Sequence, residues 1–261
     1  MEVFRKIVAV VTALAVAVCF VGLGFLACTL PPVTHGLSSV FAQDELSPFD
    51  RNQLVKVADA TRDYSFGSHD ELALYQVIYE VNDEYRQAVT ENGGLVPAAF
   101  PALNAVRDAG NIEQYRAAFE NASELYCYTP ATVSHLDDCH AIAAAAYPVL
   151  IACAIIGAAG LFFTGTTGGK RRLGTTLLGA GLAVLVGFVV VGAWAAIDFT
   201  GFFAAFHQLF FAQQSNWTFP YDSLLICSLP QPFWMGMGIV FLLVAVLVCV
   251  ASILVGQRLR K

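Results

Sequence analysis

The sequence contains little charge. Only 13% of its 261 residues are charged, whereas 57% are hydrophobic. Soluble domains carry about 25% charged residues, so this composition is typical of a membrane protein. The sequence also lacks a Gly-x-Ser-x-Gly elbow, a His-Glu-x-x-His pair, a P-loop and a dinucleotide fingerprint. An enzyme with this sequence must therefore work without a conventional protein nucleophile.

Four segments are long and apolar enough to cross a bilayer as helices, which takes about 20 residues. They are residues 7–30, 141–163, 173–197 and 233–256. None contains Asp, Glu or His, so none offers a charge relay within the membrane. The third carries Gly179, Ala183 and Gly187 at four-residue spacing, which predicts close packing against another helix. We therefore predict an all-α membrane protein with four transmembrane helices.

Lys and Arg are distributed unevenly around these segments. Eight of the 14 lie beside the spans on one side, which holds Glu2 as its single acid. The other side holds the remaining six together with 19 Asp and Glu. Because basic loops stay inside the cell, the first side is predicted to be cytoplasmic, with both termini. The acidic outer side argues against binding to nucleic acid, which attracts basic surfaces.

The predicted layout follows from these assignments. The first span is interpreted as an uncleaved anchor because signal h-regions are usually limited to about 15 residues. A signal cleaved after Val40-Phe41-Ala42 is the alternative. The regions are the cytoplasmic N-terminus and first span 1–30, an extracytoplasmic domain 31–140, the second span 141–163, a cytoplasmic basic loop 164–172, the third span 173–197, an extracytoplasmic loop 198–232, the fourth span 233–256 and the cytoplasmic C-terminus 257–261.

The outer domain shows helix-start signals and no strand pattern, so it is predicted to be helical. Helices are expected to begin near Ser47-Pro48-Phe49-Asp50, Ser68-His69-Asp70-Glu71, Asn111 and Thr129-Pro130. The last of these should run unbroken into the second span. In the later outer loop, the apolar stretch 201–211 is too short to cross, so it is predicted to be interfacial or re-entrant.

Three of the seven cysteines, Cys127, Cys139 and Cys227, are predicted to face outward. A disulfide between Cys127 and Cys139 is one option in an oxidising exterior. No Cys-x-x-Cys pattern indicates redox or haem chemistry. The cysteines within the spans are interpreted as small apolar side chains.

Histidines near the membrane surface are the candidates for chemistry. At helical spacing, His135 shares a face with Asp138, and His140 shares one with Asp137. His135 lies roughly 9 Å before the second span, at the depth of lipid ester bonds. His207 is predicted to lie at a similar depth in the later outer loop. Acid–base chemistry at an ester is one interpretation; a helix-end ion pair and an imidazole resting at the interface are the alternatives.

Three strings together resemble a bacterial four-span family that includes the lipoprotein intramolecular transacylases, Lit. They are Glu45-Leu46 through Thr61-Arg62-Asp63-Tyr64-Ser65-Phe66-Gly67, Ser134-His135-Leu136-Asp137-Asp138, and Phe206-His207-Gln208-Leu209-Phe210-Phe211 with Trp217, Pro220, Asp222 and Pro230. The resemblance extends over nearly the whole chain. The sequence departs from the family in Asp137-Asp138-Cys139-His140, where an acid, an aliphatic residue and a lysine are expected.

The resemblance implies an activity. Lit proteins move an acyl chain from the diacylglyceryl group of a lipoprotein onto the amine of its N-terminal cysteine. It implies His135 and His207 as the catalytic residues, the lipoprotein or a membrane lipid as partner, and the bacterial cytoplasmic membrane as location. No cofactor or metal is expected. The residues assigned to orienting groups or binding substrate are Arg62, Tyr64, Asp138, Trp217 and Asp222. The rival hypothesis is a non-catalytic envelope protein whose acidic outer domain docks a partner.

Overall fold

The computed structural model of the chain describes residues 1–211 and 218–261. These residues form helices and no strand, as predicted. They divide into two compact units. The apolar unit comprises Met1–Cys28, Ala144–Phe210 and Gly238–Lys261. The acidic unit comprises Thr29–Ala143 and Phe211–Met237, and contains every Asp and Glu except Glu2 and Asp198.

Long helices account for the apolar unit. Among the described residues, three helices are long and apolar enough to cross a membrane: α1 (Glu2–Cys28), α6 (Pro130–Ile197) and α9 (Gln231–Arg260). The 68-residue α6 is broken at Gly169, where φ is 70° and ψ is 177°. Glycine adopts this positive φ readily because it has no β-carbon. Helix α6 therefore contains both the second and the third predicted apolar segments, and the turn between them is tighter than the expected loop 164–172.

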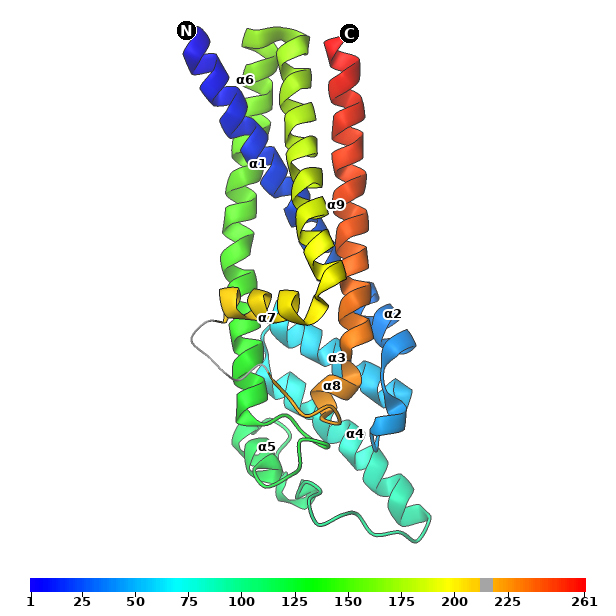
Figure 1. The fold of residues 1–261 in the computed structure, drawn as a ribbon. Coiled ribbons are helices and arrows are strands. Elements are labelled where there is room, and N and C mark those ends of the chain that lie inside the picture. The colour runs from blue at the N-terminus through cyan, green and yellow to red at the C-terminus, as the bar shows by residue number, and fades with distance from the viewer. Residues whose placement is uncertain (212–217) are drawn as a thin grey trace. The chain divides into compact units, whose positions relative to one another are not determined.

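The basic ends of these helices lie together. Figure 1 shows the start of α1, the bend of α6 and the end of α9 at one end of the apolar unit. The guanidinium of Arg172, just after the bend, donates a hydrogen bond of 2.5 Å to the Glu2 carboxylate. The segments that carry the Lys and Arg of the predicted cytoplasmic side thus share one end of the unit.

Close helix packing depends on other glycines than those predicted. A β-carbon on Gly174 would lie 2.5 Å from the carbonyl oxygen of Gly256, and one on Gly181 would lie 2.9 Å from that of Cys249. At Gly179 and Gly187, by contrast, nothing lies within 4 Å of the added atom. The predicted ladder was therefore wrong, because the spacing identified small residues but not the face of α6 that meets α9.

The acidic unit contains shorter helices. They are α2 (Pro31–Phe41), η1 (Asp44–Leu46), α3 (Arg51–Phe66), α4 (Glu71–Glu91), η2 (Leu103–Ala105), α5 (Ile112–Phe119) and α8 (Leu224–Ser228), together with the first turns of α6. Asp50, Asp70 and Asn111 cap α3, α4 and α5 by accepting a hydrogen bond from a backbone N–H of the first turn. The predicted helix starts are thus confirmed, although Asp50 and Asp70, and not Ser47 and Ser68, cap α3 and α4. Helix α2 was not predicted.

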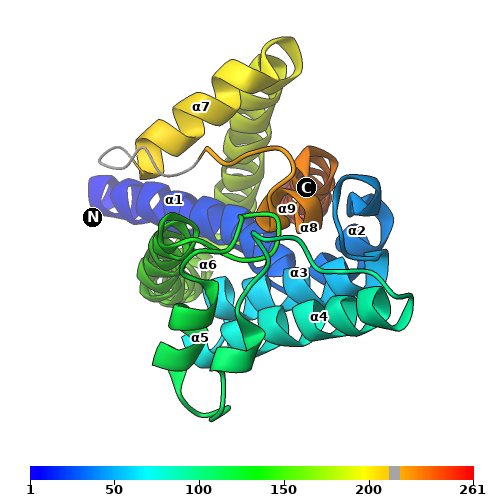
Figure 2. The same ribbon diagram turned by 90° about the horizontal axis from the view of Figure 1, so that it is seen from below.

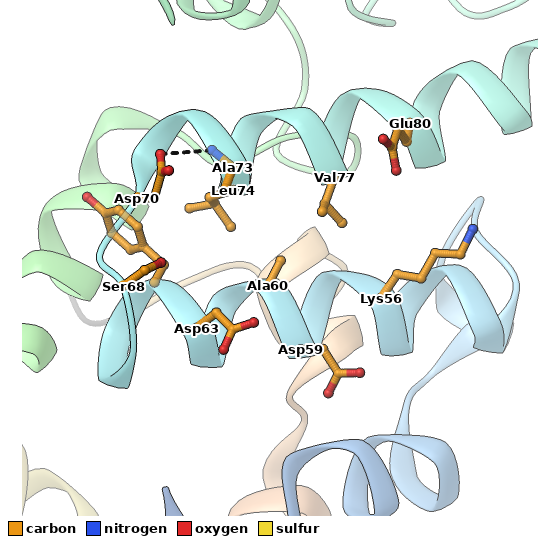
Figure 3. Close-up of a pocket in the computed structure, with 11 residues that line it drawn as sticks. Lys56, Asp59, Ala60, Asp63, Ser68, Asp70, Ala73, Leu74, Val77 and Glu80 are labelled. Atoms are coloured by element: carbon orange, nitrogen blue, oxygen red, sulfur yellow. Dashed lines mark hydrogen bonds between the residues drawn. The ribbon is translucent and has the colours of Figure 1, made fainter. Parts of the chain in front are cut away.

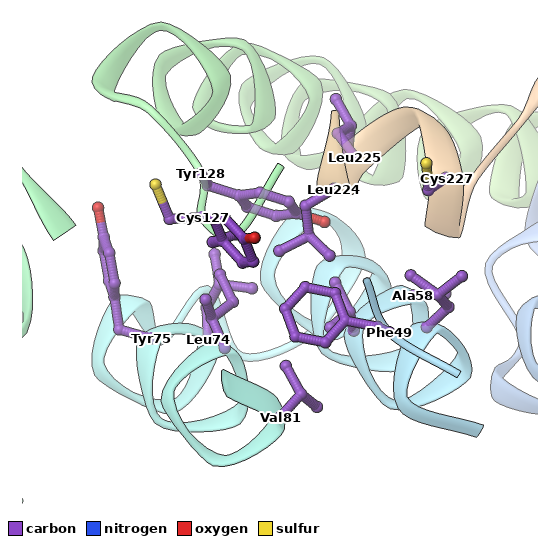
Figure 4. Close-up of a cluster of buried hydrophobic side chains, with 14 of the residues drawn as sticks. Phe49, Ala58, Leu74, Tyr75, Val81, Cys127, Tyr128, Leu224, Leu225 and Cys227 are labelled. Carbon is purple, nitrogen blue, oxygen red and sulfur yellow. The ribbon is translucent and has the colours of Figure 1, made fainter. Parts of the chain in front are cut away.

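Helices α3 and α4 lie side by side in both Figure 1 and Figure 2 and enclose much of the core of this unit. Figure 4 shows that α8 also contributes to the core, through Leu224 and Cys227, which are fully buried. Backbone hydrogen bonds connect α8 to the rest of the unit. The Leu224 N–H donates to the Glu124 carbonyl oxygen (2.8 Å), and the Gln43 N–H donates to the Cys227 carbonyl oxygen (2.9 Å). The later outer loop is thus partly built into the same unit as residues 29–143.

All seven cysteines are described by the structure, and all are free thiols. Cys127 is buried in the core, and its thiol lies 3.5 Å from the Ser123 carbonyl oxygen. Cys139 lies on α6 beside His135. The Cys127–Cys139 disulfide considered above is therefore not formed, because the two thiols belong to different environments.

Candidate functional site

The first turns of α6 carry two of the candidate residues, His135 and Asp138. The helix begins at Pro130, as predicted, with the Thr129 hydroxyl accepting a hydrogen bond of 3.3 Å from the Thr132 N–H. Val133 and Leu136 point into the core of the acidic unit. This burial directs the intervening and following polar side chains, His135 among them, toward the sides of the helix.

His135 lies among aromatic rings. The centre of its ring is 5.0 Å from that of Phe211 and 5.7 Å from that of Phe219. Its Nε2 lies 3.8 Å from the Cys139 thiol, one turn further along α6. The imidazole is half-buried. A proton-transfer group at the edge of an apolar surface is suited to a reaction on a lipid ester.

A second cluster occupies another face of the same turns. The Tyr64 hydroxyl donates a hydrogen bond of 2.5 Å to Asp137 Oδ1. His69 stacks on Tyr64 at 4.4 Å and on His140 at 3.9 Å, and we call these three rings the ring stack. Burial and the hydrogen bond to Asp137 raise the pKa of Tyr64, so its hydroxyl keeps its proton as the donor.

His69 was not among the candidate residues selected from the sequence. The helical spacing did place Asp137 and His140 on one face, but their partner comes from the turn between α3 and α4. His69 has a φ of 53°, the only positive value among the described non-glycine residues. No local sequence signal marks that conformation for a histidine, although Gly67-Ser68 before it indicated a turn.

The other predicted residues are distributed around these clusters. Arg62 on α3 is mostly buried and forms an ion pair with Asp63, while its Nε has no hydrogen-bond partner among the described residues. Asp138 is half-buried on α6, one turn beyond His135. Asp222 is half-buried in the turn before α8, near the Cys227 thiol. Trp217 lies outside the described residues.

His207 belongs to the apolar unit, whereas His135 belongs to the acidic unit. It lies on α7 (Phe199–Phe210) and is 9% exposed. Its Nδ1–H donates a hydrogen bond of 2.8 Å to the Phe203 carbonyl oxygen, which leaves the lone pair of the neutral ring on Nε2. Burial lowers the pKa of His207, and the hydrogen bond opposes this only in part. The ring is therefore neutral at neutral pH, as a base must be.

A shallow cavity of about 360 Å³ lies between α3 and α4 and contains neither candidate histidine. Figure 3 shows its rim of charged side chains, among them Asp59, Asp63, Asp70 and Glu80, with Lys56 at one end. Ala60, Leu74 and Val77 form its apolar part. Within residues 1–211 and 218–261, no group of three or more His, Cys, Asp or Glu is arranged to hold a metal ion.

Comparison with known proteins gives a consistent result. Residues 114–234 match the family described as lipoprotein intramolecular transacylase Lit. No curated protein matches the chain. The membrane integral lipoprotein intramolecular transacylase Lit from Bacillus cereus has a similar fold, with a TM-score of 0.69 at 13% identity over 99% of this chain and 97% of that one. A histidine-to-arginine variant of it gives 0.61 at 15% identity, over 99% and 92%. The family resemblance predicted from the sequence is thereby confirmed.

Proposed function

We propose that this chain, a member of the Lit family by the match of residues 114–234, catalyses intramolecular acyl transfer on bacterial lipoproteins. The observation that carries the proposal is the position of both candidate histidines inside the matched segment. His135 and His207 were also the histidines selected by their expected depth at the membrane surface. The surroundings of each support acid–base chemistry on an acyl ester.

The proposed membrane arrangement has four crossings, made by α1, the two limbs of α6 and α9. The break at Gly169 supports two crossings within α6. The shared end of the basic segments supports placing both termini and the bend in the cytoplasm of the bacterial cell. The acidic unit then lies outside the cytoplasmic membrane. Helix α7 has 12 residues, too few to cross, which supports an interfacial position for His207.

The proposed reaction begins with proton transfer from the lipoprotein's N-terminal ammonium to a neutral histidine. The freed amine attacks the neighbouring ester carbonyl of the diacylglyceryl group, an amide C–N bond forms, and the nitrogen gives up a second proton. The ester C–O bond breaks, and the departing glycerol oxygen takes that second proton by way of the other histidine. The product is an N-acylated lyso-form lipoprotein, and the first proton passes from the base to water as the one proton released overall.

We assign the base to His207 and the acid to His135. The lowered pKa of His207 and its fixed tautomer support Nε2 as the proton acceptor. Because the amine and the ester are parts of one substrate molecule, holding them in register replaces a bimolecular encounter. Arg62 and Asp138 are proposed to orient the reacting groups by hydrogen bonds, and Tyr64 to support α6 through Asp137. Trp217 and Asp222 are proposed to contact the substrate.

Mass spectrometry of the N-terminal lipopeptide of a reporter lipoprotein tests the proposal. Co-expression with this protein should move one acyl chain from glycerol to the amine. His135→Ala and His207→Ala should each lower the rate of transfer about 10²- to 10⁴-fold, the usual contribution of a general acid or base. The matched control is His35→Ala, because His35 is exposed, pairs with Asp59 and lies outside the matched segment.

The control variant should transfer the acyl chain at the wild-type rate. A reporter that stays diacylglyceryl-modified beside well-expressed, folded protein contradicts the proposal for that substrate. Docking of an envelope partner by the acidic unit would then be the function to pursue.

A further inference from the structure

The backbone of His69 is held in an unusual conformation. A φ of 53° is uncommon for a residue with a β-carbon, although Asn, Asp and His adopt it more often than other such residues. Such a conformation persists only where the surrounding contacts determine it. His69 lies in the turn between α3 and α4, directly before Asp70, whose carboxylate caps α4.

The contacts that hold His69 are made chiefly by its ring. The ring is inserted between Tyr64, at 4.4 Å and an interplanar angle of 28°, and His140, at 3.9 Å and 14°. Its Nδ1 lies 3.1 Å from the Tyr64 carbonyl oxygen, a local hydrogen bond. Its Nε2 lies 3.6 Å from Asp137 Oδ1, too long for a hydrogen bond but within ion-pair distance for a protonated ring. Stacking is thus the link between this turn and α6 that does not depend on the protonation of His69.

The ring stack meets α6 on a different face from His135. His140 lies five positions after His135, and at about 100° per residue this places the two side chains well apart around the helix. The core side chains Val133 and Leu136 anchor the turn that carries His135. His69 stacks on His140 on one side of α6, and Phe211 and Phe219 lie near His135 on another. A rotation of these turns would change both contacts together.

We infer that His69 is a positioning residue for acyl transfer: its ring, inserted between Tyr64 and His140, fixes the rotation of the first turns of α6 and so the direction of the His135 imidazole. This inference rests on the proposed function. It assigns no contact between His69 and the substrate. The backbone conformation of His69 is what places its ring at the right height for insertion.

Three substitutions separate the ring from the backbone. His69→Ala removes the ring, and His69→Asn removes it while tolerating the positive φ. His69→Phe keeps a ring that can stack. We expect the first two to lower kcat about tenfold to a hundredfold, since small misplacements of reacting groups have effects of this size. KM should change little, because the substrate contacts remain. His69→Phe should keep kcat near the wild-type value. The control is His35→Ala, which should also leave kcat unchanged.

Amide hydrogen exchange provides a readout that does not depend on activity. Peptides covering residues 131–141 should exchange faster in His69→Ala and His69→Asn than in wild type or His69→Phe, because the ring no longer restrains α6. An unchanged kcat in His69→Ala, or equal losses in His69→Ala and His69→Phe, overturns the inference while the proposed function stands. A wild-type protein without transfer activity refutes the proposed function, and unchanged exchange in His69→Ala then refutes the insertion as well.

Discussion

The apolar and acidic units satisfy their polar groups in different ways. In the apolar unit, buried hydroxyls donate to backbone carbonyls: Thr12 to Val8 and Thr176 to Arg172 on their own helices, and Ser252 of α9 to Leu177 of α6. In the acidic unit, side chains far apart in sequence pair with each other, as Arg116 does with Glu71. A helix in a membrane must satisfy its backbone internally, whereas a water-exposed domain can use distant partners. Substitutions that disturb helix packing should therefore be the most destabilising in the apolar unit. In the acidic unit, substitutions that remove core or polar contacts should be.

Removing a core side chain of the acidic unit should have the largest effect on stability. Leu224→Ala leaves a cavity between α8 and α3–α4 and should lower the free energy of unfolding by about 2–5 kcal/mol. Chemical denaturation of the purified protein in detergent, followed by tyrosine fluorescence, measures the change. Leu95→Ala is the control, because Leu95 is 92% exposed. Equal stability of the two variants would contradict the placement of α8 in this core.

Adding a side chain to the apolar unit should have the next largest effect. Gly181→Leu inserts atoms against the Cys249 carbonyl and Ile253, and should cost about 1–3 kcal/mol of stability. The thermal unfolding midpoint in detergent measures it. Gly187→Leu is the matched control on the same helix, since its added β-carbon meets nothing within 4 Å. A larger loss in Gly187→Leu would show that the predicted ladder, and not Gly181, faces a neighbouring helix.

The pH dependence of acyl transfer tests His207, the proposed base, which belongs to the apolar unit. An unperturbed histidine loses half its base form at about pH 6.5. Because burial lowers the pKa of His207, the neutral base persists below that pH, and the rate should fall only as pH drops through the lowered value. Rates of acyl transfer measured between pH 5 and 8, with folding checked at each pH, would locate this fall in rate on the acid side of the profile. An acid limb centred above pH 6.5 would argue against His207 as the base.

Removing one buried hydroxyl of the acidic unit should have the smallest effect. Burial raises the pKa of Tyr128 to about 12, so its hydroxyl keeps its proton. Thr61 donates to the Val57 carbonyl, so Tyr128 donates to Thr61, at 2.7 Å. Tyr128→Phe should therefore cost about 0.5–1.5 kcal/mol in chemical denaturation. The exposed Tyr221→Phe is the control, and a loss as large as that of Leu224→Ala would contradict this assignment.

Features determined by neighbouring residues were predicted well. The helix starts near Asp50, Asp70 and Asn111 and the proline at the start of α6 depend on residues within one helical turn, so their signals are visible in the sequence. The apolar segments were also recognisable, because crossing a membrane requires an unbroken run. The two histidines were selected by their position beside such runs. Their assignment to catalysis stays a prediction.

By itself, the sequence determined that this is a helical protein with apolar helices long enough to cross a membrane, uneven charge and two histidines near the ends of apolar segments. Only the tertiary structure decided that α8 joins the core of the acidic unit, that Gly174 and Gly181 meet α9, and that His69 is inserted between Tyr64 and His140. Hydropathy and capping depend on residues within a few positions of each other. Helix faces and ring stacks depend on residues tens of positions apart, whose meeting no local pattern records.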